Sequence, residues 1–418
     1  MARRRSTRAL INDAAIRDAA IELVLSEGID AISFRDVGRI AGLTHGALYA
    51  RFEDVEELLV DLWREVLSHR AIALFTAALE ASSNATAQNV HDLFDFVRNA
   101  TPADAAMVQV LLTSRRFVIL YEDVESFIHD YLENDDPGMN EVRSRALLFF
   151  GLVMVQILQQ SLFGIDADDL EYLESIILAS LSLGLNDVDA VELMEPTDRI
   201  IPAPSNELRS QLAYHTFSAV GKSGYTRATI SRISRRANCS PGAIYKLYPS
   251  KEDLVISATR KIMQAPWISI TTLAEVLDSG VLAQLLFAAS SAQNSVRKSF
   301  TLEIAIASAH SDKIRAAVQT QMQGLELLVP LIEGIDEDEK TELCHVIRSI
   351  ISMSLGTSFL STVTKATDRV DFNGFAEPVR QAILQRERLK WMDIRQQLLQ
   401  LASATRGALS QHSSSAQG

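Results

Sequence analysis

The sequence predicts an all-α fold, and three observations carry that prediction. Hydrophobic residues make up 47% of the 418 residues, which is ample for buried helical cores. Helix-forming residues such as alanine, leucine, glutamine and arginine abound, whereas there are only ten prolines and few alternating, strand-like stretches. The third observation is an internal repeat: residues 33–58 align without a gap with residues 229–254, and seven positions are identical. Such a repeat decides how the chain is organised.

Each copy of the repeat has the pattern of a helix, a tight turn and a second helix. The first helix begins after a hydroxyl residue suited to capping, Ser33 in one copy and Thr229 in the other. Gly42 and Asn238 follow this helix, and these residue types best tolerate the left-handed backbone of a sharp turn. The second helix and a third helix also begin at capping residues, which are Thr44, Ser240, Asp54 and Ser250.

The second helix of each copy has an exposed face that suits DNA. Both copies keep a glycine there, Gly46 and Gly242, although a glycine inside a helix costs about 1 kcal/mol relative to alanine. Two glycines in register indicate that another molecule approaches this helix closely. The same face has a tyrosine in each copy, Tyr49 and Tyr245, next to basic residues. Such a helix fits a DNA major groove, where tyrosine and cations reach phosphates.

These residues give each copy a resemblance to the DNA-binding domain of TetR-family transcriptional regulators. In the first copy the resemblance runs from Gly28 through Ala41-Gly42-Leu43-Thr44, Gly46 and Leu48-Tyr49 to Leu58. In the second copy it runs from Gly224-Tyr225 through Gly242 and Ile244-Tyr245 to Ser250-Lys251-Glu252-Asp253-Leu254. It covers about 60 residues of each copy, and two copies at a constant offset make a chance match improbable.

The resemblance implies a set of DNA-contacting residues in each copy. In the first copy these are Ser33, Arg35, Arg39, Thr44, His45, Gly46, Tyr49 and Arg51. In the second copy they are Thr229, Arg232, Arg235, Ser240, Pro241, Gly242, Tyr245, Lys246 and Lys251. Arg39 and Arg235 are in register and are the strongest candidates for a shared contact. His45 either reads a base or is simply solvated, and Pro241 is fully explained by its place in the first turn of a helix.

The charge of the chain is distributed unevenly. A net charge of −13 at first argues against a nucleic-acid partner. However, residues 205–262 have ten basic and three acidic residues, whereas the aligned residues 9–66 have five basic and twelve acidic ones. Residues 1–8 add four arginines. The basic charge thus lies on the second copy and the N-terminal arm, and an acidic body would orient both towards DNA. For the arm, DNA contact and a merely solvated tail are equally good interpretations.

The order of motifs predicts seven segments. A linker is expected where three prolines interrupt any helical pattern, and a disordered tail where Ser and Gln dominate. The segments are a basic arm (1–8), a helix-turn-helix domain (9–67), a helical regulatory domain (68–185), the linker (186–205), a second helix-turn-helix domain (206–263), a second helical regulatory domain (264–402) and the tail (403–418).

One apolar stretch, Ala146–Ile165, has no charge over 20 residues and is long enough to cross a membrane. Gln156, Gln159 and Gln160 fall on one helical face, however, and charged helices flank the stretch. We therefore predict a buried bundle helix and no membrane partner. By resemblance, the last two long helices of each half form a four-helix dimer interface. The expected helices are Ala146–Ile165, Asp168–Leu185, Lys340–Thr364 and Phe375–Leu401.

Because both halves lie in one chain, the resemblance implies a covalent pseudo-dimer on double-stranded DNA. The recognition residues differ between copies, which predicts an asymmetric or imperfectly palindromic operator. The basic second copy should dominate affinity, so Tyr245→Phe or Lys251→Ala should weaken binding more than Tyr49→Phe. Whether the chain pairs further is open.

The resemblance also implies a small-molecule effector that releases the protein, as a repressor, from DNA. Composition gives a mild preference for an apolar or amphipathic molecule. Aromatic residues of the first regulatory domain line a pocket or, more commonly for such residues, form core; they are Phe94, Phe96, Phe117, Tyr121 and Phe127.

Two other functions are alternatives to DNA binding. The sequence has no phosphate-cradling glycine loop, no HExxH and no Cys/His cluster, which predicts no catalysis, no cofactor and no metal. Two cysteines and no secretory signal predict a cytoplasmic protein. The second alternative is an interaction protein that has kept the fold and lost DNA binding in one or both copies. The acidic first copy favours it, as does Val55 where the family has lysine. The basic residues of the second copy argue against it; they are Lys251, Arg235, Arg236 and Lys246.

Overall fold

Helices make up the fold, as the sequence predicts, and the described residues contain no strand. The computed structural model describes residues 7–133, 141–183, 191–196, 204–263, 269–386 and 390–415. The helices of the first half are α1 (Thr7–Glu27), α2 (Phe34–Ala41), α3 (His45–Tyr49), α4 (Val55–Leu62), α5 (Ser68–Ser83), α6 (Ala87–Arg98), α7 (Pro102–Thr113), α8 (Val118–Phe127), α9 (Glu141–Phe163) and α10 (Ala167–Ser182).

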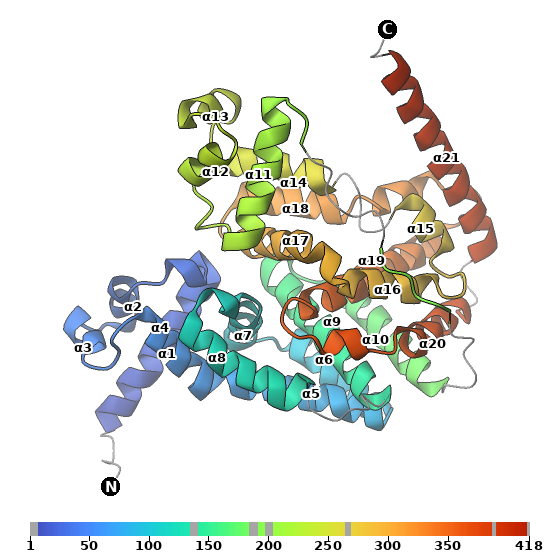
Figure 1. Cartoon of the computed structure of the whole chain (residues 1–418). Helices are drawn as coiled ribbons and strands as arrows, with labels where there is room; N and C mark the ends of the chain where they lie inside the picture. The colour runs from blue at the N-terminus through green and yellow to red at the C-terminus, as the bar shows by residue number, and fades with distance from the viewer. Residues whose placement is uncertain are drawn as a thin grey trace.

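The second half repeats the opening of the first and is also helical in its remainder (Figure 1). Its helices are α11 (Leu208–Ser223), α12 (Ile230–Arg236), α13 (Pro241–Leu247), α14 (Lys251–Met263), α15 (Ile270–Glu275), α16 (Val281–Ser290), α17 (Ser295–Ala307), α18 (Asp312–Met322), α19 (Glu337–Leu360), α20 (Phe372–Leu384) and α21 (Trp391–Ser415).

Side chains fix where the long helices begin. Thr101 and Asp104 form a reciprocal capping box at the start of α7, and Asp336 and Glu339 form one at the start of α19. Asp104 is also completely buried and accepts hydrogen bonds of 2.6 and 2.8 Å from Arg70 on α5. Burial opposes ionisation, but the hydrogen bonds from Arg70 and Thr101 prevail and lower the pKa of Asp104. The same carboxylate therefore caps α7 and ties it to α5.

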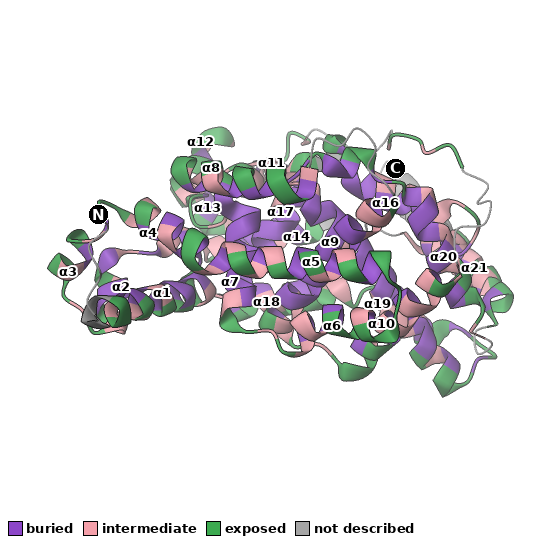
Figure 2. Cartoon of the chain, turned by 90° about the horizontal axis from the view of Figure 1, so that it is seen from below, coloured by how far each residue is buried: buried purple, intermediate pink, exposed green. Residues whose placement is uncertain are grey.

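Helices α9 and α19, one from each half, pack against each other at the centre of the molecule. A glycine on each helix permits the contact: a Cβ on Gly151 would lie 2.8 Å from the carbonyl oxygen of Gly356, and the reverse distance is also 2.8 Å. Both helices are long and apolar enough to cross a membrane, but most of each apolar window is buried inside the protein (Figure 2). The prediction that Ala146–Ile165 is a buried bundle helix is therefore confirmed.

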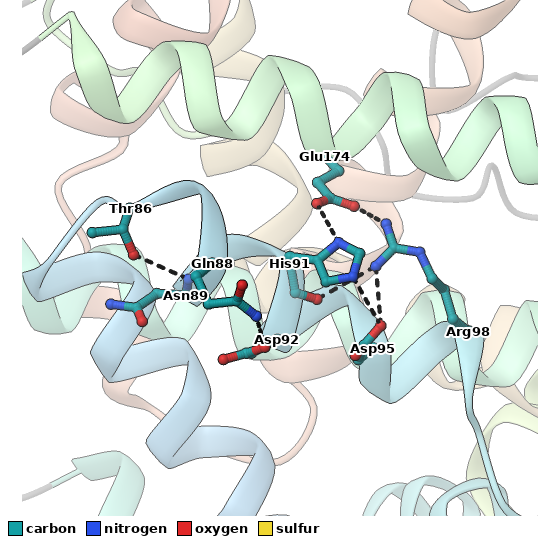
Figure 3. A network of polar contacts seen from close by, with 8 residues as sticks. All are labelled: Thr86, Gln88, Asn89, His91, Asp92, Asp95, Arg98 and Glu174. Atoms are coloured by element: carbon teal, nitrogen blue, oxygen red, sulfur yellow. Dashed lines mark hydrogen bonds and ion pairs between the residues drawn. The ribbon is translucent and has the colours of Figure 1, made fainter.

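Of the predicted bundle helices Asp168–Leu185 and Phe375–Leu401, the structure contains the first, as α10, but not the second as one helix. Helix α10 packs against α20 and α6. The Glu174 carboxylate on α10 lies 3.1 Å from the Nδ1 atom of His91 and forms an ion pair with Arg98, and both of these residues belong to α6 (Figure 3). The single helix predicted over Phe375–Leu401 is wrong, because the structure divides it into α20 and α21. Helix α21 turns away to pack on α15. Packing against different partners thus overrides one continuous helical pattern.

The two helix-turn-helix units are attached to the body differently. The apolar residues of α1–α4 belong to one large core that continues through both regulatory regions. Those of α11–α14 form a separate, smaller core with residues from α17 and α18. Phe217 of α11, for example, lies 5.0 Å from Phe300 of α17, between ring centroids. The second unit is therefore held chiefly through α17 and α18.

The predicted arm, linker and tail fall partly outside the described residues. Residues 1–6, 184–190 and 197–203 are not described, so the arm and most of the linker lie there. The described linker segment 191–196 lies on the second half, where the Met194 backbone exchanges two hydrogen bonds with Gln284. The tail was predicted to be disordered, but α21 continues to Ser415.

Candidate nucleic-acid interface

The turn of each helix-turn-helix unit has the geometry that the sequence predicts. Gly42 has φ +66° and Asn238 has φ +49°, so both lie in the left-handed region. The predicted caps are also confirmed, because each side chain accepts a hydrogen bond from a backbone amide in the first turn of its helix. These caps are Ser33, Thr44, Asp54, Thr229, Ser240 and Ser250. In each unit the turn thereby fixes the second helix, α3 or α13, against the first.

Helices α3 and α13 bury one residue each and expose the face predicted to meet DNA. Leu48 and Ile244 are completely buried, whereas Tyr49 and Tyr245 remain 57% and 54% exposed. A Cβ added to Gly46 would meet nothing within 4 Å, and one added to Gly242 would meet only the Ser240 hydroxyl, at 3.8 Å. Neither glycine is thus required by a neighbour within the described protein. Their bare surface is open to an external molecule.

The cations of the first copy are partly neutralised. Arg35 and Arg39 are exposed, yet each lies within 4 Å of a carboxylate oxygen of Asp36, at 3.8 and 3.9 Å. A hydrogen bond from the Ser33 hydroxyl lowers the pKa of Asp36, and the two arginines add to that effect. Arg51 follows α3 and donates to Asp13 of α1 at 2.7 Å and to the Ala47 carbonyl of α3 at 3.1 Å, so its guanidinium is engaged within the domain.

The cations of the second copy are freer. Arg232 stands where the first copy has Asp36, which reverses the charge at that position. Arg232, Arg235 and Lys246 are exposed, and among the described residues none of them has a carboxylate partner. Arg232 donates to the carbonyl of Arg227 at 3.2 Å. Thr229, Ser240 and Pro241 are exposed beside them. The structure thus concentrates uncompensated positive charge on α12 and α13.

Lys251, which is predicted to contact DNA, also makes contacts within the second unit. Its ammonium donates to the carbonyl of Tyr225 at 2.5 Å and lies 4.0 Å from the centre of that ring. Burial lowers the pKa of Lys251, and burial followed by Glu252 raises the pKa of Tyr225 to about 12. Lys251 therefore braces the loop between α11 and α12, and its positive charge is less available than those of Arg235 and Lys246.

The two units touch each other through a set of residues that the sequence analysis missed. We call Asp30, Arg116, Arg227, Glu303 and His310 the junction cluster. Arg227 of the second unit lies 2.9 Å from Asp30 of the first, and Arg116 of the first half pairs with both Asp30 and Glu303. Glu303 also accepts from the Tyr225 amide at 3.0 Å. The carboxylates are buried, so these contacts exclude most water.

The junction is reciprocal between the halves. Gly28 and Gly224 end the first helix of each unit with the same φ of +82°. A Cβ on Gly28 would meet His310 of the second half at 3.3 Å, and one on Gly224 would meet Arg116 of the first half at 2.7 Å. The matching glycines were visible in the sequence, but their partners lie on loops of the opposite half. No helical periodicity marks such residues.

Both units lie on the same side of the molecule, with α2–α3 and α12–α13 at the left of Figure 1 and of the perpendicular view in Figure 2. The comparisons with known proteins agree with this duplicated arrangement. The family model described as "Bacterial regulatory proteins, tetR family" matches twice, at residues 16–62 and 216–258. No curated protein matches the chain.

Proposed function

The chain belongs to the tetR family of bacterial regulatory proteins and contains its DNA-binding domain twice, and we propose that it is a ligand-released repressor in which one polypeptide acts as a dimer. Members of this family are DNA-binding transcription regulators that respond to small-molecule effectors. In the proposed molecule each half supplies one recognition helix, α3 or α13, to one half-site of an operator.

The observation that carries this proposal is the position of two helix-turn-helix units on the same side of the molecule. Helices α9 and α19 pair the halves at the centre, and the junction cluster joins the units directly. Dimeric helix-turn-helix proteins read half-sites about 34–36 Å apart, one helical turn of DNA. A fixed pair of units on one side of the molecule suits that task.

We propose that the two half-sites differ. Thr44, His45 and Tyr49 would face one half-site, while Ser240, Pro241 and Tyr245 would face the other. Arg235, Lys246 and Arg232 give the second unit the larger share of phosphate contacts. The exposed Arg35 and Arg39 would need to exchange Asp36 for phosphate, which reduces their net contribution.

Footprinting and gel-shift titration on DNA from upstream of the protein's own gene test this proposal. We expect one protected region with two unequal halves. Replacing one phosphate-contacting side chain should reduce the slope of log affinity against log salt by about 1. Tyr245→Phe should weaken binding more than Tyr49→Phe, because its surroundings are not neutralised. The reverse ranking would contradict the predicted dominance of the second copy.

The alternative is an interaction protein that does not bind DNA. For the first copy only, it is favoured because Arg51 is bonded to Asp13 and Arg35 lies beside Asp36, which leaves less positive charge for DNA. It predicts that Arg235→Ala leaves affinity for every tested DNA unchanged. We further propose that the protein acts in the cytoplasm, where its operator and effector meet, and that it functions without catalysis or a cofactor.

A further inference from the structure

The seam between the two halves contains two neighbouring cavities. One has a volume of about 260 Å³ and the other about 130 Å³, and they share Gln159, Phe163, Met322 and Ile351 as lining residues. Helices α9 and α10 of the first half contribute lining residues, as do α17, α18 and α19 of the second half. The aromatic residues Phe94 and Phe127 of the first regulatory domain are instead buried in the core.

The smaller cavity is predominantly apolar, and its polar lining residues are Gln159, Thr301, Gln321 and Ser354. Leu158, Leu162, Val318 and Phe359 are among its lining residues. Ser354 also lines it, is 3% exposed, and its hydroxyl oxygen has no hydrogen-bond partner within the described part of the chain. An unpartnered buried hydroxyl is costly, so a polar atom supplied from outside would stabilise it.

The larger cavity has a mixed lining in which the charged residues are predominantly acidic. Gln156, Gln159, Gln319 and Gln323 contribute amides to it. Its charged lining residues are three carboxylates and one guanidinium: Asp166, Asp169, Glu326 and Arg348. Arg348 holds Asp169 at 2.8 Å and Glu326 at 2.7 Å, which leaves Asp166 without that counter-charge. The joined space therefore has an apolar end and an acidic, hydrogen-bonding end.

We propose that this seam is the effector site and that it binds one amphipathic cation, with the apolar body between α9, α17 and α19 and the cationic end at Asp166. A carboxylate or sulfate at the same end would meet like charge and bind less well. One chain offers this composite site between its halves, so the bound molecule contacts both of them.

The site also connects to the second DNA-binding unit. Thr301 and Ile304 of α17 line the apolar end, and Ile304 and Phe300 pack into the core of that unit. A ligand that displaces α17 would displace α11–α13 with it. The effect on DNA rests on the proposed repressor function, whereas binding itself does not.

Calorimetric titration of the full chain without DNA tests the site. The probes are the decyltrimethylammonium ion and decanoate, which share a chain length and differ in charge. We expect saturable binding of one cation per chain and at least tenfold weaker binding of decanoate. No saturable binding of the cation, or equal binding of both probes, would overturn the proposal.

Two variants with matched controls locate the site. Ala305→Phe fills the apolar end and should weaken cation binding at least tenfold, whereas Ala77→Phe, at a half-buried alanine of α5, should not. Asp166→Asn keeps the helix cap but removes the charge, and should weaken cation binding about threefold at low salt. Asp336→Asn makes the same change at the cap of α19 and should have no effect.

If Ala305→Phe does not fold, the comparison of Asp166→Asn with Asp336→Asn tests the site by itself. Equal effects of these two variants on cation binding would reject the site. DNA release is measured separately by fluorescence anisotropy of labelled operator. Cation binding that leaves DNA bound would retain the site and reject ligand release as the function.

Discussion

At the scale of single residues, the open surface of α3 and α13 depends on Gly46 and Gly242. Neither glycine is needed for packing, since nothing lies within 4 Å of a Cβ on Gly46 and only Ser240 approaches Gly242. A residue type that weakens a helix persists at both positions without a structural reason inside the protein. The reason we infer is the approach of DNA.

Gly242→Leu should therefore separate stability from DNA binding. A Cβ has room at this position and leucine is the better helix former, so the free energy of unfolding should stay equal or rise by up to about 1 kcal/mol. Operator affinity in gel shifts should fall at least tenfold because the side chain blocks the groove. Gly46→Leu should cause a smaller loss on the more acidic first unit. Unchanged affinity in both variants would show that α3 and α13 do not enter a groove.

Lys298 gives the protein a pH-dependent stability. Its side chain is 1% exposed and donates to the Ser290 carbonyl at 2.7 Å. Burial lowers its pKa to about 8, although Asp368 partly opposes this. Between that value and the ordinary pKa of about 10.4 the unfolded chain binds more protons, so stability rises with pH across this window.

The rise in the free energy of unfolding that Lys298 causes across this pH window should reach at most about 3 kcal/mol. Urea unfolding from about pH 8 to about pH 10 measures it as the difference between the wild type and Lys298→Met. The methionine variant should lose most of this slope and be the more stable protein near neutral pH. Parallel pH profiles for the two proteins would mean that the lysine is not held in the buried position.

At the scale of helices, the close contact of α9 with α19 sets how the halves meet. The backbones touch at Gly151 and Gly356, where any side chain would overlap the opposite helix. Small residues at such a crossing permit short interhelical distances, and the surrounding apolar residues are fully buried.

Gly356→Ala should consequently destabilise the protein by about 1–3 kcal/mol, because its methyl group must push the two backbones apart. Gly46→Ala is the matched control in an uncrowded helix, and it should be neutral or slightly stabilising. Urea unfolding midpoints measure both. Equal shifts in the two variants would contradict the tight crossing.

The sequence predicted those features that depend on neighbouring residues. The caps at Ser33 and Ser240 and the left-handed turns at Gly42 and Asn238 were correct because local backbone chemistry determines them. The role of Lys251 was not foreseen, since its partner Tyr225 is brought to it by tertiary folding. The junction cluster and the seam cavities, formed between residues of opposite halves, left no local pattern. The same reason explains the missed break between α20 and α21.

At the scale of the whole molecule, the junction cluster fixes one DNA-binding unit against the other. Asp30 is 3% exposed and pairs with both Arg116 and Arg227, which come from different halves. Burial lowers the pKa of Arg116, against the influence of Asp30. Such a buried contact resists changes in the separation of α3 and α13.

Arg227→Ala should broaden the range of half-site spacings that the protein accepts. Arg227 is 44% exposed, so its loss should cost under about 1 kcal/mol of stability while freeing the second unit from Asp30. Gel shifts over a series of operator spacings measure the range. Arg64→Ala breaks an exposed ion pair with Asp123 elsewhere in the first half, and its spacing profile should match the wild type. A profile for Arg227→Ala as narrow as the wild type would show that the junction does not set the spacing.

The meeting of α9 and α19 inside one polypeptide also has a cellular consequence. Each half encounters its mate at a local concentration that the chain itself sets, whatever the amount of protein in the cell. At low expression, occupancy of a regulated promoter would then increase in proportion to the protein copy number. For subunits that must first associate, occupancy would instead increase with the square of the copy number. A regulator built this way would respond to dilution at cell growth more gradually.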